Sequence, residues 1–252
     1  MRRQGIAVLE VQIAVAKTHK YASRESGDTV EVVERPHGGL SVLLVDAQGS
    51  GPAAKTLSNL IVSRGVSLIK EGARDGAVAR AVHGYLYTLR GGRVSAALTI
   101  ASVDLQSRSL LVSRNDACPA CFFSRDGIEV HDEPAEPIGV RLRIRPVIVE
   151  RPLKEYLGVV VMSDGVVQAG AYRGRPFDVP AFLASHLAEG WPAASALADA
   201  LLGRAMALEE GRPHDDATVV VVAIVPALEE ENPVRRLAAR LPIETTSRGL
   251  SA

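Results

Sequence analysis

The sequence lacks an excess of charge of either sign. Its 252 residues include 29 lysines and arginines and 29 aspartates and glutamates, so the formal net charge at pH 7 is zero. Proteins that bind nucleic acid or an anionic membrane through bulk electrostatics usually carry a clear basic excess. The balanced charge indicates neither partner, and we expect no nucleic acid and no membrane.

A long hydrophobic run is also missing from the start of the chain. In "MRRQGIAVLEVQIAVAK" two arginines precede apolar residues, but Glu10, Gln12 and Lys17 interrupt the run. A spanning helix needs about 20 predominantly apolar residues, and a signal peptide needs an unbroken apolar centre. We therefore expect a soluble protein with a cytoplasmic location.

Cysteine is scarce, with only Cys118 and Cys121, in the stretch "CPAC". This spacing occurs in half of a zinc site and in redox pairs. A zinc site needs two more ligands, but the sequence has no second CxxC and no HxxxH. A redox pair would open a helix after a strand, whereas both flanks here are typical of strands. We interpret the pair as reduced cysteines near a strand junction.

Internal repeats and low-complexity tracts are absent, so one folded domain is the simplest organisation. Hydrophobic residues make up 47% of the chain, which is enough for a substantial core. We place this domain at residues 1–228. Residues 229–252 are charged and interrupted by proline, and we expect a C-terminal tail that could hold one short helix.

Apolar spacing predicts strands and helices in separate clusters. Strands are expected at residues 5–16, 28–35, 39–46, 94–115 (a hairpin turning at 106–108), 121–132 (turning at 126–127), 140–150, 156–162 and 217–225. Helices are expected at 52–71, 74–91, 177–190 and 192–211, with Asp178 as an N-cap and Gly211 closing the last helix. This order favours a layered α+β protein over alternating βαβ units.

Carboxylates stand at the ends of three apolar strands. Asp46 and Asp164 follow their strands, whereas Asp215 and Asp216 come directly before the last one. Side chains at two strand ends meet one at a strand start only if the third strand runs opposite to the other two. We therefore predict an antiparallel last strand.

A cluster of ionised aspartates requires a cation, because like charges raise one another's pKa and destabilise the fold. Oxygen ligands without His or Cys favour hard ions such as magnesium or manganese. Each Asp alone could simply cap a turn. All three positions, each joined to an apolar run, favour a metal site.

The stretch "DAQGSGPAAK" also matches G-x-G-x-x-A, a weak signal for a dinucleotide-binding loop. Asp46 would direct negative charge at the pyrophosphate, and the next element is another helix rather than a parallel strand. We favour a different role, in which Gly49 and Gly51 let the backbone turn around a metal bound by Asp46 and the Ala47 carbonyl.

Five segments, in order, resemble motifs of the metal-dependent serine/threonine protein phosphatases (the PPM family), in particular the bacterial SpoIIE-like and RsbX-like branch. The segments are "SGD" (26–28), "VDAQGSGPAA" (45–54), "NDACPA" (115–120), "MSDGVVQAG" (162–170) and "HDDATVVVV" (214–222). The resemblance implies a four-layer αββα sandwich, in which helix pairs flank two antiparallel sheets and metals bind at one edge.

The resemblance also implies the roles of the site residues. Asp46 would bridge two divalent cations, Mn²⁺ or Mg²⁺, while Asp164 and Asp215 would each add a carboxylate and Ala47 its backbone oxygen. Asp28 would act through a metal-bound water, and Asp216 is a weaker candidate ligand. A hydroxide bridging the two metals would then attack phosphoserine or phosphothreonine, with Asp46, Asp164 and Asp215 as the catalytic set.

The chain departs from the family motifs at three positions. Gln48 stands where some relatives have a histidine that is proposed to protonate the leaving group, and glutamine is a poor proton donor. Cys118 replaces the histidine of the Asn-Ala-Gly-His motif, and Gln168 replaces a glutamate. Neither of these two changes removes an expected metal ligand.

Two further residues close to the motifs have open roles. Arg24, near "SGD", could contact substrate phosphate, although a lone arginine in a turn is more often solvated. His214 precedes the aspartate pair and could tune or donate a proton, but we interpret it as a surface turn histidine.

By analogy with RsbX-like phosphatases, the expected partner is a phosphorylated bacterial regulator of the STAS-domain or stressosome type. Fold analogy identifies substrates poorly. The alternative is a pseudophosphatase that uses the fold as a binding module in the same kind of circuit, and a dinucleotide-dependent enzyme is a more distant one.

Overall fold

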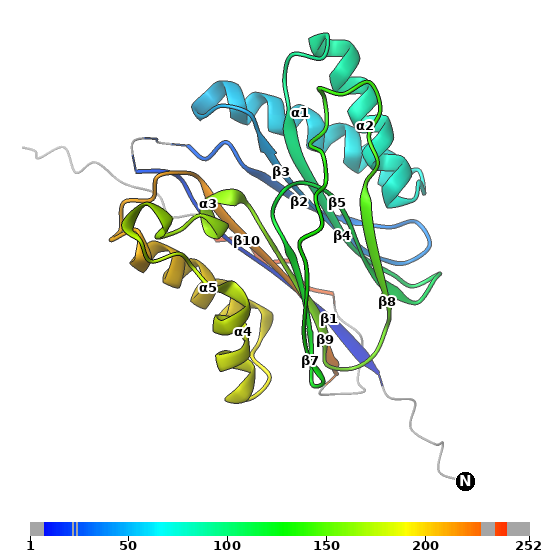
Figure 1. Cartoon of the computed structure of the whole chain (residues 1–252). Coiled ribbons are helices and arrows are strands. Elements are labelled where there is room, and N and C mark those ends of the chain that lie inside the picture. The colour runs from blue at the N-terminus through cyan, green and yellow to red at the C-terminus, as the bar shows by residue number, and fades with distance from the viewer. Residues whose placement is uncertain (1–7, 22, 24, 228–234, 241–252) are drawn as a thin grey trace, which may run out of the picture.

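Two antiparallel sheets of five strands form the middle of the structure (Figure 1). The computed structural model describes residues 8–21, 23, 25–227 and 235–240. Sheet I consists, in spatial order, of β1 (Leu9–Thr18), β10 (Ala217–Pro226), β9 (Leu157–Met162), β6 (Ala120–Ser124) and β7 (Gly127–His131). Sheet II consists of β2 (Thr29–Glu34), β3 (Gly39–Ala47), β4 (Ala96–Asp104), β5 (Ser109–Asn115) and β8 (Val147–Pro152).

Two helix pairs cover the outer faces of the sheets (Figure 1). α1 (Gly51–Lys70) and α2 (Asp75–Arg90) pack on sheet II, and α4 (Val179–Ala188) and α5 (Ala194–Leu208) pack on sheet I. The layers therefore follow the order helices, sheet, sheet, helices, which confirms the predicted α+β, αββα sandwich. Within the described residues no helix is long and apolar enough to cross a membrane.

Three apolar clusters separate these four layers. Between the sheets, Val42 and Val112 of sheet II pack in one cluster with Phe122 and Val222 of sheet I. The outer clusters join α1 and α2 to sheet II, and α4 and α5 to sheet I. Because each sheet buries both faces, its central strands have no solvent-facing side.

The burial of both faces explains the continuous apolar runs of the central strands. All six residues of β9 are buried, and eight of ten in β10. Successive side chains alternate between faces, so Val159 and Val161 enter the cluster between the sheets while Val160 and Met162 face the helices. Each fully buried valine of this kind contributes about 1.5–3 kcal/mol through the hydrophobic effect.

Most expected elements are confirmed within a few residues of their predicted bounds. The two hairpins are present, with β4 paired to β5 and β6 paired to β7. Asp178 caps α4, because its carboxylate accepts a hydrogen bond of 3.0 Å from the Ala181 N–H. Gly211 lies beyond the last residue of α5, has φ of 72°, and donates its N–H to the backbone oxygen of Met206.

The prediction of a strand at residues 140–150 is wrong for the first half of that range. β8 begins only at Val147, and residues 139–143 form bends. Pro146 has no N–H to donate to a neighbouring strand, so the regular pairing with β5 starts after it. Two short helices escaped prediction, α3 (Asp164–Val167) and the 3-10 turn η1 (Ala171–Arg173).

The expected tail lies largely outside the described residues. Residues 235–240 are described and have no regular secondary structure, and they are exposed. Arg235 lies 3.1 Å from the carboxylate of Glu34 at the end of β2. The boundary between domain and tail at residue 228 stays a prediction.

Candidate active site

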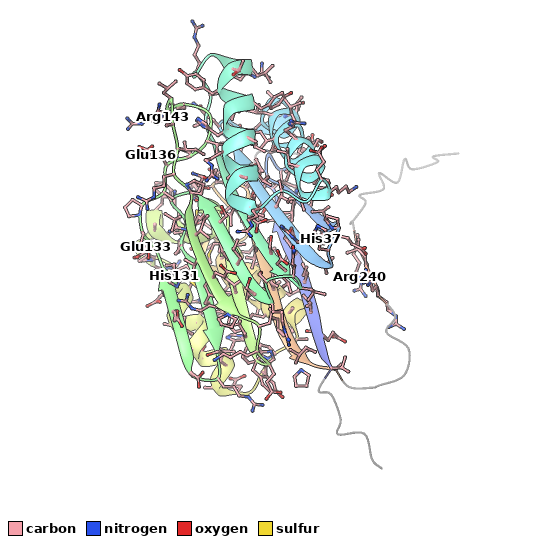
Figure 2. The ribbon with its side chains drawn as sticks, turned by 90° about the vertical axis from the view of Figure 1, so that its right-hand side faces the viewer. His37, His131, Glu133, Glu136, Arg143 and Arg240 are labelled. Carbon is pink, nitrogen blue, oxygen red and sulfur yellow. The ribbon has the colours of Figure 1, made fainter. Side chains whose placement is uncertain are left out.

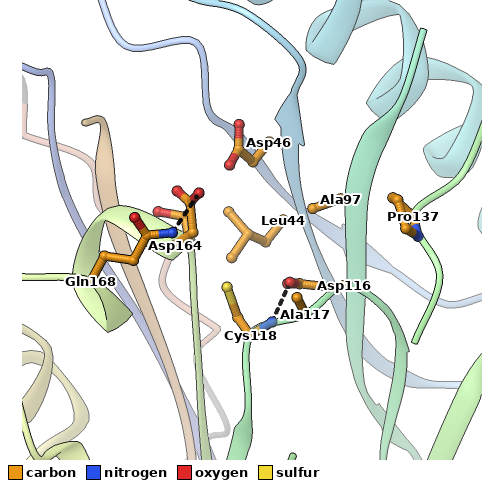
Figure 3. A pocket seen from close by; sticks show the side chains of 10 residues that line it. Leu44, Asp46, Ala97, Asp116, Ala117, Cys118, Pro137, Asp164 and Gln168 are labelled. Atoms are coloured by element: carbon orange, nitrogen blue, oxygen red, sulfur yellow. Dashed lines mark hydrogen bonds between the residues drawn. The ribbon is translucent and has the colours of Figure 1, made fainter. Parts of the chain in front are cut away.

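A cavity of about 210 Å³ opens at the edge where the strands carrying the predicted aspartates end (Figure 3). The residues that line it come from both sheets and include Asp46, Ala97, Asp116, Cys118, Asp164 and Gln168. Sequence reasoning predicted two of them as metal ligands, Asp46 and Asp164. The structure therefore brings together two aspartates that are separated by more than a hundred residues in the chain.

Asp46 is the penultimate residue of β3 and pairs in register with Ala97 of β4. In the described part of the chain no hydrogen-bond or ion-pair partner contacts its carboxylate. Burial and the nearby carboxylates of Asp28, Asp164, Asp215 and Asp116 raise its pKa to about 8. Asp46 is thus a carboxylate that lacks a positive counterpart.

Asp164 follows β9 and opens the short helix α3. Gly165 permits this position, because a Cβ there would collide with the backbone oxygen of Asp216. The close approach brings the start of α3 against the backbone that precedes β10. Burial and the charges of Asp215 and Asp116 raise the pKa of Asp164, and Gln168 donates a bond of 3.4 Å to its carboxylate.

The prediction for the direction of the last strand is confirmed. β10 pairs with β9 in antiparallel register, with Val219 opposite Met162. The start of β10 therefore lies beside the end of β9, and Asp215 reaches the same edge as Asp164. The Oδ1 of Asp215 accepts a bond of 2.8 Å from the Asp216 N–H.

Asp216 has a structural role in the loop before β2. Its Oδ1 accepts a hydrogen bond of 2.9 Å from the Lys20 N–H, and its Oδ2 accepts one of 2.7 Å from the Gly27 N–H. Both oxygens thus hold the described parts of the 20–27 loop against the start of β10. Its weaker expected role, as a metal ligand, stays a prediction.

Asp28 is buried, with 1% of its surface exposed, and is not among the residues that line the cavity. Its Oδ2 accepts a bond of 2.6 Å from the Thr218 hydroxyl. Burial raises its pKa to about 6, and the Asp216 charge adds to this, although the hydroxyls of Thr218 and Ser163 and the Lys17 ammonium act in the opposite direction. Its expected contact through a metal-bound water stays a prediction.

The glycine-rich turn after β3 has the backbone shape that the sequence predicted. Ala47 ends the strand and is buried, and Gly49 and Gly51 have φ of 102° and 70°. These left-handed values favour glycine. Gln48 directs its side-chain oxygen to the N–H and hydroxyl of Ser95, at 3.1 and 3.3 Å, which fixes the turn to the start of β4.

Asp116 is a cavity residue that sequence reasoning missed. Its carboxylate accepts a bond of 2.6 Å from the Cys118 N–H (Figure 3). It also accepts one of 3.2 Å from the Thr99 hydroxyl. The rule applied to Asp46 could have found it, because β5 runs parallel to β3 through their shared neighbour β4. An aspartate directly after β5 must therefore lie at the same edge.

A buried arginine holds the Asp116 turn in place. Arg114, 2% exposed, donates hydrogen bonds to the backbone oxygens of Asp116, Cys118 and Glu133, at 2.9, 2.8 and 2.7 Å. Bonds to backbone oxygens satisfy the guanidinium while leaving the Asp116 carboxylate directed into the cavity. The turn is thus fixed independently of any ligand.

Both cysteines are free and buried, as the sequence interpretation expected. Cys118 lines the cavity in the connection between β5 and β6, and Cys121 lies on β6 in the cluster beneath α4 and α5. Burial raises the pKa of both thiols, to about 12 for Cys121. Both are therefore thiols at neutral pH.

The two residues with open roles have different outcomes. Arg24 lies outside the described residues. His214 is half-exposed, bonds to the Glu209 carboxylate and stacks near Tyr172, with ring centroids 5.2 Å apart. This position agrees with a surface turn histidine.

The donor chemistry of the cavity fits a hard divalent cation. Carboxylates that raise one another's pKa are stabilised by a positive charge, and oxygen donors suit magnesium or manganese. As they stand, however, the described residues include no group of three or more His, Cys, Asp or Glu side chains arranged to hold a metal ion. Binding would thus require side-chain movement toward a shared point.

Comparison with known proteins identifies the family. The chain matches the family model described as Stage II sporulation protein E (SpoIIE) over residues 36–225, which is more than half of its length. No protein with a curated description matches it.

Solved structures match the fold. The PP2C phosphatase domain and regulatory fragment of the cell fate determinant SpoIIE from Bacillus subtilis superposes with a TM-score of 0.73 and 20% identity, covering 88% of this chain and 66% of that chain. The RsbU and RsbW domains of Rv1364c from Mycobacterium tuberculosis give 0.68 and 18%, with coverage of 88% and 62%. A serine/threonine phosphatase from S. agalactiae gives 0.65 and 13%, with coverage of 85% and 99%.

The chain thus spans less than two thirds of the SpoIIE and Rv1364c structures that it matches. At these identities the structures establish the fold, and the family model establishes the relationship. With five ordered motifs, an αββα sandwich and aspartates gathered at one sheet edge, the chain belongs to the SpoIIE family of PP2C-type serine/threonine phosphatase domains.

Proposed function

We propose that the chain is an active metal-dependent phosphatase that hydrolyses phosphoserine or phosphothreonine. The observation that carries the proposal is the meeting of Asp46 from sheet II with Asp164 from sheet I around one cavity. Family membership supports the same reaction class. The cavity is small and polar at its aspartate end, which suits a phosphate group better than a large cofactor.

Two divalent cations, Mn²⁺ or Mg²⁺, would be held by the carboxylates of Asp46, Asp164 and Asp215 and the backbone oxygen of Ala47. When bound, such cations supply a water of lowered pKa and neutralise charge on phosphoryl oxygens. Asp28 would orient water from its buried position, where the Thr218 hydroxyl fixes one of its oxygens. Asp216 would hold the loop before β2.

The chain's own groups also limit how the leaving group obtains a proton. Gln48 bonds to Ser95 and is a poor proton donor, so it does not take the place of the histidine that some relatives carry. Burial raises the pKa of Cys118, so its thiol keeps its proton at neutral pH. We therefore propose that solvent water supplies the proton to the serine or threonine oxygen.

The proposed substrate is a phosphorylated regulatory protein of the STAS-domain or stressosome type, in the cytoplasm. Supporting evidence comes from solved relatives, one of which contains RsbU and RsbW domains and another of which comes from work on the bacterial stressosome. Both are matched at 20% identity or less, so this part of the proposal rests on analogy.

A metal-dependent assay tests the proposal. We expect hydrolysis of a small aryl phosphate with Mn²⁺ or Mg²⁺, and a loss of about 100-fold or more in kcat for Asp46→Ala, Asp164→Ala and Asp215→Ala. Asp199→Asn, on the exposed face of α5, is the matched control and should retain activity. Equal activity with and without metal would contradict the proposal.

The second candidate is a pseudophosphatase that holds a partner without hydrolysis. It is favoured by the absence, within the described residues, of a ready group of three metal-ligand side chains. It predicts no metal-dependent turnover in the wild type but normal partner binding. Turnover that disappears in Asp46→Ala would exclude it.

A further inference from the structure

The segment that joins β7 to β8 exposes arginines and apolar side chains in alternation. We call residues 140–145 the arginine segment; it reads Val-Arg-Leu-Arg-Ile-Arg. Arg141, Arg143 and Arg145 are all exposed, and Leu142 is 75% exposed. Figure 2 shows Arg143 extending outward from the molecule above Glu136. Val140 is also 43% exposed, so the segment presents two apolar side chains among its arginines.

The arginine segment begins from a fixed anchor. Ile138 exchanges two backbone hydrogen bonds with Ala96, of 3.1 and 2.9 Å. Gly139, with φ of 99°, donates its N–H to the buried Nδ1 of His83 at 3.0 Å, and a Cβ there would collide with the Val94 oxygen and Leu86. At its far end, Ile144 packs on the cluster under α1 and α2. The arginines therefore project from a held backbone.

The arginine segment begins three residues after Pro137, which belongs to the cavity wall. Pro137 lines the cavity on the side away from Asp164 (Figure 3). The chain just before it is held by the Asn115 side chain, which donates a bond of 2.9 Å to the Glu136 oxygen. Because three residues span at most about 10 Å, residues that flank a phosphorylated residue in the cavity can reach the start of the arginine segment.

The charge of the arginine segment is largely uncompensated. Within the described residues only Arg141 has a carboxylate at ion-pair distance, that of Glu136 at 3.4 Å. Neither Arg143 nor Arg145 has such a partner there. Because the whole chain has zero net charge, this is a local basic surface rather than part of a general excess.

We propose that the arginine segment is the docking surface for acidic residues that flank the phosphorylated serine or threonine of the protein substrate. This inference rests on the proposed phosphatase function. The three guanidinium groups pair with Asp or Glu of the partner, and Leu142 covers an apolar side chain beside them. The exposed leucine favours a polypeptide over a nucleic acid, whose backbone offers phosphates but no apolar side chain.

Two phosphoserine peptides test the proposal, one flanked by Asp, Glu and Leu and the other with Asn and Gln in place of the acids. We expect the wild type to favour the acidic peptide about tenfold in kcat/KM, since three exposed ion pairs each contribute modestly. In the triple variant Arg141→Gln, Arg143→Gln, Arg145→Gln the ratio should fall close to one. The preference should also weaken in high salt.

The matched control replaces three exposed arginines elsewhere, Arg64→Gln, Arg80→Gln and Arg204→Gln, and removes the same charge. It should keep the wild-type ratio. Because the ratio compares two peptides on one protein, a loss of stability does not imitate the effect. An equal loss of preference in the control variant, or no preference in the wild type, would overturn the proposal.

Binding of the fluorescent acidic peptide, followed by anisotropy, separates this inference from the proposed function. If the wild type hydrolyses no phosphate yet binds this peptide more tightly than the triple variant does, the docking surface stands and only the catalytic proposal fails. Tighter binding of a single-stranded DNA oligonucleotide, lost in the same variant, would overturn the docking proposal in favour of a nucleic-acid site.

Discussion

The carboxylate of Asp46 faces other carboxylates, and within the described part of the chain neither a lysine nor an arginine bonds to it. Such a partly buried acid binds its proton more tightly in the folded state than in the unfolded state. Proteins usually avoid such an arrangement unless a ligand supplies the missing charge. The stability of the metal-free fold is therefore coupled to pH at this residue.

We expect the free energy of unfolding of the metal-free protein to fall as pH rises toward 8. The pKa of Asp46 is about 8 in the folded state and near 3.8 when unfolded, so folding favours the protonated form across this window. The stabilisation is fully present below about pH 4 and is lost as pH rises through about 8. Urea titrations in the presence of a chelator at pH 5, 6.5 and 8 measure the slope of the free energy of unfolding against pH.

Asp46→Asn should reduce this slope, because asparagine does not titrate, while the raised pKa values of Asp28 and Asp164 leave a smaller slope in place. Asp199→Asn, which changes an exposed acid on α5, should keep the slope of the wild type. An unchanged slope in Asp46→Asn would show that the burial of this carboxylate does not control stability.

Asp216→Ala should lower the free energy of unfolding by about 1–3 kcal/mol, because it leaves the N–H groups of Lys20 and Gly27 without their acceptor. Proteolysis within the loop before β2 should accelerate at the same time. Chemical denaturation and limited trypsin digestion measure the two effects. If Asp216 acted only as a metal ligand, the metal-free protein would keep its stability and its resistance to trypsin.

At the scale of elements, the contact between α1 and sheet II depends on a glycine in the helix. A Cβ at Gly65 would collide with the fully buried Leu43 of β3. On α2, by contrast, a Cβ at Gly84 would meet nothing within 4 Å. Gly65 is therefore needed for packing, whereas Gly84 is not.

Gly65→Val should destabilise the protein by about 1–3 kcal/mol through overpacking. Gly84→Ala should instead stabilise it by about 0.5–1 kcal/mol, because alanine favours the helix more than glycine does. Thermal and urea unfolding of both variants provide the comparison. Equal effects from the two substitutions would contradict the packing described for α1.

Sequence reasoning predicted the elements best where the apolar pattern was regular. The run from Ala217 to Val225 is buried on both faces, so its pattern indicates a central strand directly. Residues 140–146 also alternate, but Pro146 and the bonds of Ile138 and Gly139 hold them outside the sheet. Alternation alone does not report which hydrogen-bond partners are available.

The candidate site was predictable only in part, and only where regular apolar strands indicated its position. The positions of Asp46 and Asp164 after apolar strands indicated a shared edge. Asp116 was not predicted, although it directly follows the apolar strand β5. Asp216 accepts hydrogen bonds from the N–H groups of Lys20 and Gly27, and Gln48 accepts one from the N–H of Ser95. These partners are far away in the sequence, so no local pattern predicts the bonds.

At the scale of the whole molecule, the proposed ligands come from both sheets, so only the assembled sandwich brings them together. We expect Mn²⁺ at about 100 times its Kd to stabilise the protein by about 2.7 kcal/mol, which corresponds to a rise in Tm of about 5–10 °C. Calorimetry with and without metal measures the shift.

Asp46→Ala, in sheet II, and Asp164→Ala, in sheet I, should each abolish most of this rise in Tm, whereas Asp199→Asn should retain it. A full rise in either of the first two variants would place the ion elsewhere on the molecule.

The collision that excludes a side chain at Gly165 has a consequence for protein engineering. The peptide at the start of α3 and the one before β10 touch directly, so neither can be rebuilt without the other. Anyone who transplants this centre into a new scaffold, or exchanges it between homologous proteins, should move residues 163–165 and 215–216 as one cassette.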